Sequence, residues 1–200
     1  MKKFYNYLPY LMIIVLFISC TAMPGSRSTT VVIPPVPELI MGQGILPPED
    51  MAAFLLSVNL NINANFVREL TVIYAEEAAR EGVNHDVAFA QMILETGYLR
   101  YGGLVTPEMN NFAGMGAIGP GENGLSFPSP RIGVRAQIQH LNAYASTLPL
   151  NLELVNPRFH LVRRGSSPGI SGLAGTWAAD PLYADKIKNI LQRMYIFSFS

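Results

Sequence analysis

The sequence contains a single cysteine, Cys20, and only three histidines, His85, His140 and His160. One cysteine excludes a disulfide within the chain. Because this thiol precedes every segment with a helical pattern, it is not placed to act as a nucleophile in a folded domain. The histidines stand far apart and form no helical ligand pair. We therefore expect no cysteine-based catalysis, no bound metal and no cofactor.

Charge is also scarce, because charged residues make up 14% of the chain and Lys and Arg balance Asp and Glu at 14 each. No polybasic surface is present, which argues against a nucleic-acid partner. Glycine is plentiful, but no glycine-rich segment has the strand-to-helix context of a phosphate-binding loop. Half of the 200 residues are apolar, which is enough for one globular domain with a core.

The N-terminus has the pattern of an export signal: a basic "MKK", the apolar stretch "LPYLMIIVLFIS", and then Cys20. This apolar stretch is shorter than the ~20 residues that a bilayer-spanning helix needs. A lone cysteine after Ser19 resembles a bacterial lipoprotein signal, which implies a lipid anchor on Cys20 and a location in the cell envelope. An uncleaved anchor and a secreted protein with an unpaired thiol are the alternatives, and both also predict export.

Three regions follow from composition. Residues 1–20 form the lipoprotein-type signal peptide, residues 21–48 a Pro- and Ser-rich tether, and residues 49–200 one domain. The tether's short apolar pieces, "VVI" and "ELIM", could dock on the domain, and the sequence does not decide this.

Within the domain, helical periodicity and capping residues predict a mainly α fold. Helices are expected at residues 48–59, 64–82, 84–97, 129–146, 170–179 and 180–195. Asn84 or Asp86 is the expected cap of the third helix, Ser129 of the fourth and Asp180 of the last. Residues 98–130 are too rich in Gly, Pro and Asn for a simple connection, so we expect a small irregular or β lobe that is functional or mobile.

Glu95 is the candidate for catalysis, because it ends an apolar helix. The negative end of the helix dipole and burial both raise the pKa of a carboxyl group at this position. A raised pKa is what a general acid needs to protonate a glycosidic oxygen near neutral pH. A glutamate that turns to solvent where the helix frays is the alternative.

Four segments, in order, resemble the bacterial peptidoglycan-hydrolysing N-acetylglucosaminidases of the mannosyl-glycoprotein endo-β-N-acetylglucosaminidase-like family. These are "GVNHDVAFAQMILETGYLRYGG", "NNFAGMGA", "FPSPRIGVRAQIQHL" and "WAADPLYADKIKNIL". The resemblance covers residues 65–194 approximately and implies a lysozyme-like helical domain with a small lobe over the groove. It also implies that Glu95 is the catalytic acid and Tyr183 the active-site tyrosine.

Other site residues are less directly indicated. Gln91 lies one turn before Glu95 and could orient the acid or a sugar, and an ordinary polar helix residue is the alternative. Asn111 and Phe112, from "NNFAGMGA", are candidate substrate-binding residues, and a buried aromatic anchor is the alternative for Phe112. Trp177 is interpreted as core or groove wall.

The resemblance also implies a second carboxylate in the lobe, with Glu122 preferred over Glu108 because Glu122 follows "NNFAGMGA" and lies in a glycine-flanked loop. A solvated loop glutamate is the alternative for Glu122. The separation between the two carboxyl groups decides between a retaining and an inverting path. Assistance by the substrate's own 2-acetamido group is a third path, in which Glu95 acts without a second acid.

The resulting prediction is an exported peptidoglycan hydrolase that cleaves the glycosidic bond after N-acetylglucosamine. The expected partners are the glycan strands of peptidoglycan and, through Cys20, a membrane. A lytic transglycosylase and a non-catalytic peptidoglycan-binding lipoprotein are the alternatives.

Overall fold

A computed structural model of the protein describes residues 31–119 and 122–200. Cys20, the leader and the first part of the tether lie outside these residues. The described part is mainly helical, as predicted, with five α-helices. They are α1 (Pro48–Val58), α2 (Ala64–Glu81), α3 (His85–Glu95), α4 (Pro130–Ala145) and α5 (Tyr183–Phe199). No helix within these residues is long and apolar enough to span a membrane.

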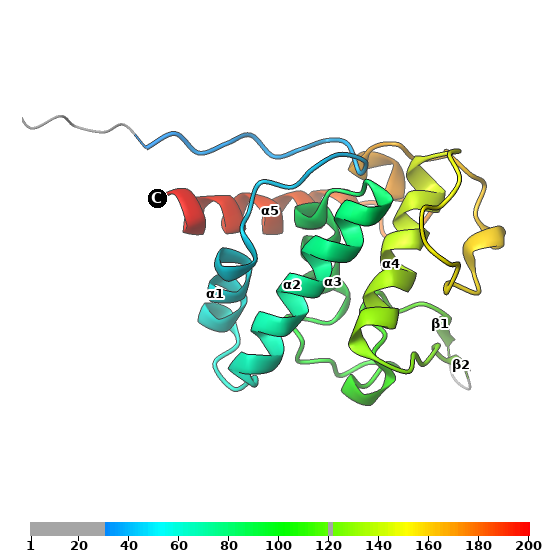
Figure 1. Ribbon diagram of the computed structural model, residues 1–200, viewed down its shortest axis with the longest axis horizontal. Helices are drawn as coiled ribbons and strands as arrows, with labels where there is room; N and C mark the ends of the chain where they lie inside the picture. Colours follow the sequence, from blue (N-terminus) through cyan, green and yellow to red (C-terminus); the bar gives the residue numbers. More distant parts are fainter. Residues whose placement is uncertain (1–30, 120–121) are drawn as a thin grey trace, which may run out of the picture. The chain divides into compact units, whose positions relative to one another are not determined.

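Helices α2, α4 and α5 pack around α3. In Figure 1, α2 lies between α1 and α4, and α3 lies behind α2. Helix α3 also contacts α4 and α5. As a result, eight consecutive residues of α3, from Asp86 to Ile93, are buried. Burial on every side explains why this helix lacks the polar face of a surface helix.

Local signals set most helix boundaries. The side chain of Asn63 accepts hydrogen bonds at the start of α2, and Gly82 ends it in a left-handed conformation. Asn84, and not Asp86, caps α3, while Ser129 caps α4 with Pro130 as its first residue. The predictions for these helices are therefore confirmed to within about two residues.

The prediction of a helix at 170–179 is wrong, because only the 3₁₀ turn η3 (Ile170–Leu173) forms there. The hydroxyl groups of Ser167 and Thr176 both donate to the carbonyl of Gly172, which leaves this carbonyl engaged by side chains. Gly175 then adopts a left-handed conformation with φ of 79°. Together these features turn the chain out of the helical path.

Asp180 is also not the cap of α5, which begins at Tyr183 after an N-cap residue, Leu182, that makes no side-chain cap. The carboxylate of Asp180 instead accepts from the backbone N–H of Leu182 at 2.9 Å and pairs with Lys186. Asp180 therefore closes the turn that precedes the helix.

Residues 98–130 contain little regular structure. A 3₁₀ turn, η1 (Pro107–Met109), precedes a short antiparallel pair, β1 (Ala117–Gly119) and β2 (Glu122–Asn123). A further 3₁₀ turn, η2 (Phe159–Leu161), follows α4. In Figure 1 the pair lies beside the N-terminal end of α4, on the side away from α2.

The segment before α1 docks on the helices through "ELIM". Ile40 is fully buried, whereas Val31 and Val32 of "VVI" are exposed. The backbone N–H groups of Ile45 and Leu46 donate to the buried carboxylate of Asp86 in α3. The compact body therefore begins before α1.

Candidate active site

The carboxylate of Glu95 is held by two donors from the C-terminal part of the chain. Its Oε1 accepts a hydrogen bond from the indole N–H of Trp177 at 3.0 Å and another from the hydroxyl of Tyr183. Burial raises the pKa of Glu95 above its ordinary value, while these two hydrogen bonds oppose the rise. The side chain is thus anchored at the end of α3 and does not turn freely into solvent.

Tyr183 is oriented by a buried chain of hydrogen bonds. Its hydroxyl accepts from Gln91 Nε2 at 3.0 Å, and Gln91 Oε1 accepts from Gln137 Nε2 at 2.9 Å. Gln137 Oε1 in turn accepts from the hydroxyl of Tyr74 at 2.5 Å. Because Tyr183 already accepts from Gln91, its own proton points to Glu95. The chain of donors therefore directs a hydrogen bond onto Oε1 of Glu95.

The other carboxylate oxygen lies beside bare backbone. A Cβ atom added to Gly114 would come within 3.3 Å of Glu95 Oε2. Gly114 also has φ of 62°, which a residue with a side chain adopts only with strain. The absence of a side chain leaves Oε2 open on this side.

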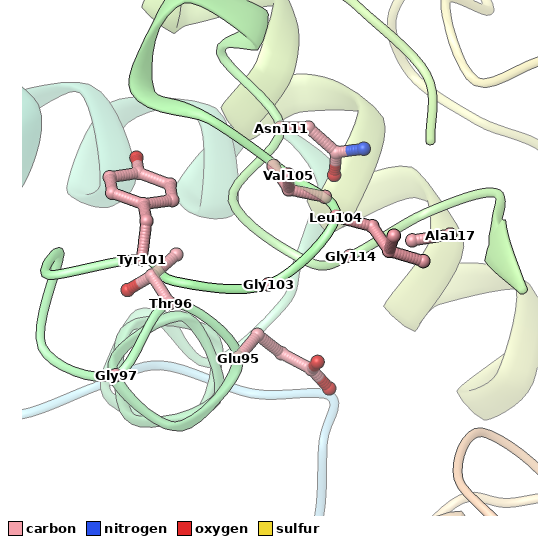
Figure 2. A pocket seen from close by; sticks show the side chains of 10 residues that line it. All are labelled: Glu95, Thr96, Gly97, Tyr101, Gly103, Leu104, Val105, Asn111, Gly114 and Ala117. Atoms are coloured by element: carbon pink, nitrogen blue, oxygen red, sulfur yellow. The ribbon is translucent and has the colours of Figure 1, made fainter. Parts of the chain in front are cut away.

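A cleft of about 300 Å³ opens at Glu95. Its walls come from the end of α3, from the segment 103–105 and from the loop that contains Asn111, Gly114 and Ala117. Figure 2 shows Glu95 projecting from the end of α3, with Thr96 and Gly97 beside it and Gly114 across from it. Such a cleft is large enough for a sugar residue.

The chain leaves α3 through a strained turn. Tyr98, Leu99 and Tyr101 have φ values between 57° and 61°, although none of them is glycine. Their conformation is held by the side chain of Asn59, which donates to the carbonyl of Tyr98, and by Thr96, whose hydroxyl accepts from Leu99 N–H. Bulky residues with a left-handed backbone conformation are rare and cluster at functional sites.

The remaining predicted residues serve as supports in this structure. Gln91 and Phe112 are fully buried, Gln91 within the hydrogen-bond chain and Phe112 against the ring of Tyr74. Asn111 lines the cleft, but its amide bonds the backbone of Ala113, Met115 and Leu125. Asn111 therefore shapes the loop that carries Gly114.

Neither candidate for a second acid has a described side chain on this cleft. Glu108 is exposed and is not among the residues that line the cleft. The side chain of Glu122 lies outside the described part of the structure, although its backbone in β2 pairs with β1, whose Ala117 lines the cleft. Among the side chains described, Glu95 is the one carboxylate on this cleft.

Three residues of the site were missed or undervalued by sequence reasoning. Trp177 is a direct partner of Glu95, and Gln137 and Tyr74 complete the chain behind Tyr183. Gln137 lies next to Ile138 on a buried face of α4, and a polar residue at such a position was the available signal. No group of three metal-ligating side chains occurs in residues 31–119 and 122–200.

Comparison with known proteins identifies the family. Residues 71–196 match the glucosaminidase family model, described as mannosyl-glycoprotein endo-β-N-acetylglucosaminidase. The chain belongs to the glucosaminidase family. An uncharacterized protein of Borreliella burgdorferi is 44% identical to this glucosaminidase-family chain over 156 residues, which span 78% of this chain and 76% of that protein.

The solved structure of one autolysin resembles this fold. Autolysin E from S. aureus, in complex with the muropeptide NAM-L-Ala-D-iGlu, has a TM-score of 0.51 at 13% identity, over 83% of this glucosaminidase-family chain and 74% of that one. The catalytic domain of the autolysin Auto from Listeria monocytogenes has a TM-score of 0.45 at 15% identity, over 78% and 90% of the two chains.

Proposed function

We propose that the protein is an exported peptidoglycan hydrolase that cleaves the glycosidic bond after N-acetylglucosamine, with Glu95 as the general acid. The observation that carries the proposal is the half-buried Glu95 carboxyl group, held at a cleft by Tyr183 and Trp177. Membership of the glucosaminidase family supports the assignment of the cleaved bond as the one after N-acetylglucosamine. The muropeptide complex of the structurally similar Autolysin E supports peptidoglycan as the substrate.

The geometry supports a specific position for the transferred proton. Oε1 of Glu95 accepts two hydrogen bonds, so the acidic proton belongs on Oε2, beside Gly114. This proton passes to the glycosidic oxygen as the bond from that oxygen to C1 of N-acetylglucosamine breaks. The groove is then used as in lysozyme-like enzymes, with the segment around β1 and β2 as a small lobe at its side.

Positive charge that develops at C1 requires a second group. Glu122 is our proposed base for the attacking water, and its place on the strand paired with β1 supports this role. The substrate's 2-acetamido oxygen is the alternative nucleophile. Glu95 would then act first as acid and afterwards as base toward water.

Digestion of purified peptidoglycan by wild type and Glu95→Gln tests the proposal. We expect wild type to release fragments with reducing N-acetylglucosamine ends in mass spectrometry, and Glu95→Gln to lose about 10²–10⁴-fold in rate. Equal digestion by both proteins would contradict the role of Glu95. Binding without cleavage by wild type would favour the non-catalytic alternative.

A lytic transglycosylase is the second candidate, because the described side chains place one carboxylate on the cleft and such enzymes act with one glutamate. Its products carry 1,6-anhydro-muramyl ends, which the same mass spectra distinguish from reducing N-acetylglucosamine. Detection of anhydro ends would show that the protein is a lytic transglycosylase and not a hydrolase. Glu95 would keep its role as the acid.

Export and membrane attachment are proposed from the leader alone. A lipid on Cys20 would tether the domain to the cell envelope through the segment before α1. Metabolic labelling with radioactive palmitate is expected to mark the wild-type protein and not Cys20→Ala. Equal labelling of the two proteins would rule out Cys20 as the lipidated residue.

A further inference from the structure

A second cleft, of about 210 Å³, adjoins the one at Glu95. The two clefts share Gly114 and Ala117 in their walls. The second cleft is also lined by Trp177, whose indole N–H bonds Glu95. A ligand that extends from the carboxyl group of Glu95 past Gly114 therefore enters this second cleft.

The second cleft contains a positive charge without a partner. Arg158 lines it and is partly exposed, and no carboxylate among the described residues pairs with its guanidinium. Its charge nevertheless acts within the cleft: it opposes the rise that burial causes in the pKa of Tyr144. A guanidinium presents N–H groups in a planar fork that matches a carboxylate.

His140 adds a neutral donor. The backbone N–H of Arg158 donates to Asn156 Oδ1 at 2.9 Å, which leaves Asn156 Nδ2 to donate to His140 Nδ1 at 2.8 Å. Burial, helped by the charge of Arg158, lowers the pKa of His140 to about 4. The imidazole is therefore neutral at pH 7 and carries its proton on Nε2.

His140 lines the cleft, and its Nε2 is the ring nitrogen that Asn156 does not occupy. No described residue bonds this atom, whereas every fully buried polar side-chain atom among the described residues has a partner. Nε2 is therefore accessible to a ligand. The ring of Trp177 lies beside His140, with ring centroids 4.8 Å apart, and supplies the apolar surface on which a sugar can rest.

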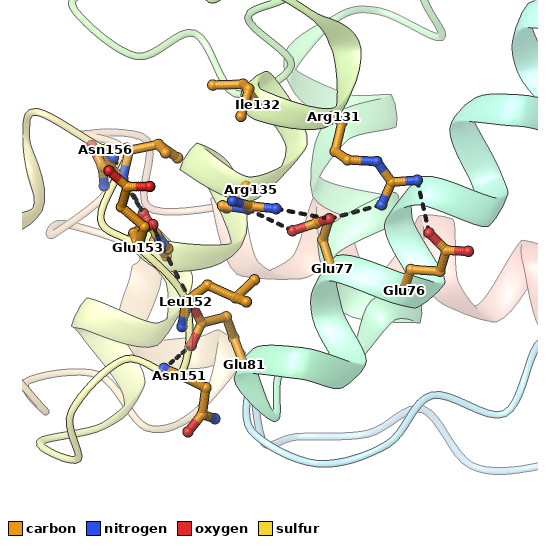
Figure 3. Close-up of polar contacts among 12 residues, drawn as sticks. Glu76, Glu77, Glu81, Arg131, Ile132, Arg135, Asn151, Leu152, Glu153 and Asn156 are labelled. Carbon is orange, nitrogen blue, oxygen red and sulfur yellow. Dashed lines mark hydrogen bonds and ion pairs between the residues drawn. The ribbon is translucent and has the colours of Figure 1, made fainter.

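The segment that carries Arg158 is held in place before any ligand binds. Glu81 of α2 accepts from the backbone N–H groups of Asn151 and Leu152, and Gln139 of α4 accepts from that of Asn156. Figure 3 shows these contacts beside the ion pairs of Glu77 with Arg131 and Arg135 that join α2 to α4. Ordering the segment in advance reduces the entropy that binding must oppose.

We propose that this second cleft binds a carboxylate on the substrate, next to the bond that Glu95 cleaves, through the guanidinium of Arg158 and Nε2–H of His140. The inference rests on the proposed function for its substrate and names the group that distinguishes peptidoglycan from a neutral N-acetylglucosamine polymer. The carboxylate belongs either to the lactyl group of an N-acetylmuramic acid that carries no peptide or to the peptide where one is attached.

Binding to Glu95→Gln protein tests the inference without turnover. The probes are N-acetylmuramic acid, N-acetylmuramyl-L-alanyl-D-isoglutamate and neutral N,N′-diacetylchitobiose. Trp177 is the only tryptophan of the chain and lines the cleft, so its fluorescence reports binding. When Arg158→Gln is combined with Glu95→Gln, binding of a carboxylated probe is expected to weaken about tenfold. Binding of chitobiose is expected to stay unchanged.

Arg163→Gln is the matched control, because Arg163 is exposed on the same connection and the charge change is identical. It is expected to bind all three probes like the parent. Dependence on Arg158 with N-acetylmuramic acid alone identifies the lactyl carboxylate, and dependence only with the muramyl peptide identifies the peptide. Equal loss for chitobiose, or no detectable binding of either carboxylated probe, would overturn the inference.

The same variant separates this inference from the proposed function. In otherwise wild-type protein, Arg158→Gln is expected to raise KM for peptidoglycan fragments with kcat nearly unchanged. If the protein binds the carboxylated probes through Arg158 but cleaves no glycan, the proposed hydrolase activity is refuted. The second cleft would still be a carboxylate-binding site.

Discussion

The hydroxyl of Tyr183, the first residue of α5, donates to Oε1 of Glu95, the last residue of α3. This contact joins two helix ends that are 88 residues apart in the chain. It gives the carboxyl group one fully occupied oxygen and one oxygen that faces the cleft. The chemistry proposed for the protein follows from this difference between the two oxygens.

Trp177→Phe is expected to move the alkaline limb of the kcat–pH profile to higher pH. The indole N–H stabilises the ionised carboxylate of Glu95, so its removal raises the pKa further. A general acid acts in its protonated form, and activity then persists to higher pH. Profiles of both proteins on peptidoglycan fragments measure the shift, and movement to lower pH would contradict it.

Glu95→Gln is expected to stabilise the protein at pH 8, by about 0.5–2 kcal/mol. The folded-state pKa of Glu95 is raised, so its favourable contribution to folding is present below the ordinary value of 4.5 and is lost as pH rises through the folded value. Glutamine does not ionise and avoids this loss. Thermal unfolding should show a higher Tm for the variant at pH 8 and similar values near pH 4.

Gln137→Leu is expected to destabilise the fold by about 2–4 kcal/mol, because Tyr74 OH and Gln91 Oε1 lose their partners inside the core. It should also lower kcat, although Gln137 does not touch Glu95. Adding Tyr74→Phe removes one orphaned group, so the double variant should be more stable than the sum of the single effects predicts. Strict additivity in urea unfolding would argue against the connected chain.

Gly133→Ala is expected to destabilise the protein by about 1–3 kcal/mol or more. A Cβ atom at this position of α4 would lie 1.8 Å from the carbonyl oxygen of Asn110, so the loop that leads to Gly114 must shift. Gly103→Ala is the control, since no atom lies within 4 Å of its added Cβ. Urea unfolding should separate the two, and equal stability would refute the close approach of α4 and the loop.

Glu122→Gln is expected to reduce peptidoglycan hydrolysis by about 10²–10⁴-fold if Glu122 activates the attacking water as proposed. Glu108→Gln, at an exposed glutamate that does not line the cleft, is the matched control and should retain activity. Full activity of Glu122→Gln would remove the second acid and favour the 2-acetamido group of the substrate.

Much of the helical framework was predictable because its signals are local. The amide side chain of Asn84 and the hydroxyl of Ser129 cap helices through atoms two or three residues away. The failures, the turn at 170–173 and the start of α5, occur where hydroxyl and carboxylate side chains bond the nearby backbone instead. Competition between such local bonds is not resolved by periodicity.

The sequence by itself determined that an acid ends an apolar helix, and hence that burial acts on the pKa of Glu95. Only the tertiary structure decided what meets that acid. Trp177 and Tyr183 come from distant parts of the chain, and tertiary packing brings them to the end of α3, with Gln137 behind Tyr183. Contacts of this kind depend on how the helices pack and not on the spacing of residues along the chain. The apolar pattern of a helix shows that one face is buried, but it does not show which other segment covers that face.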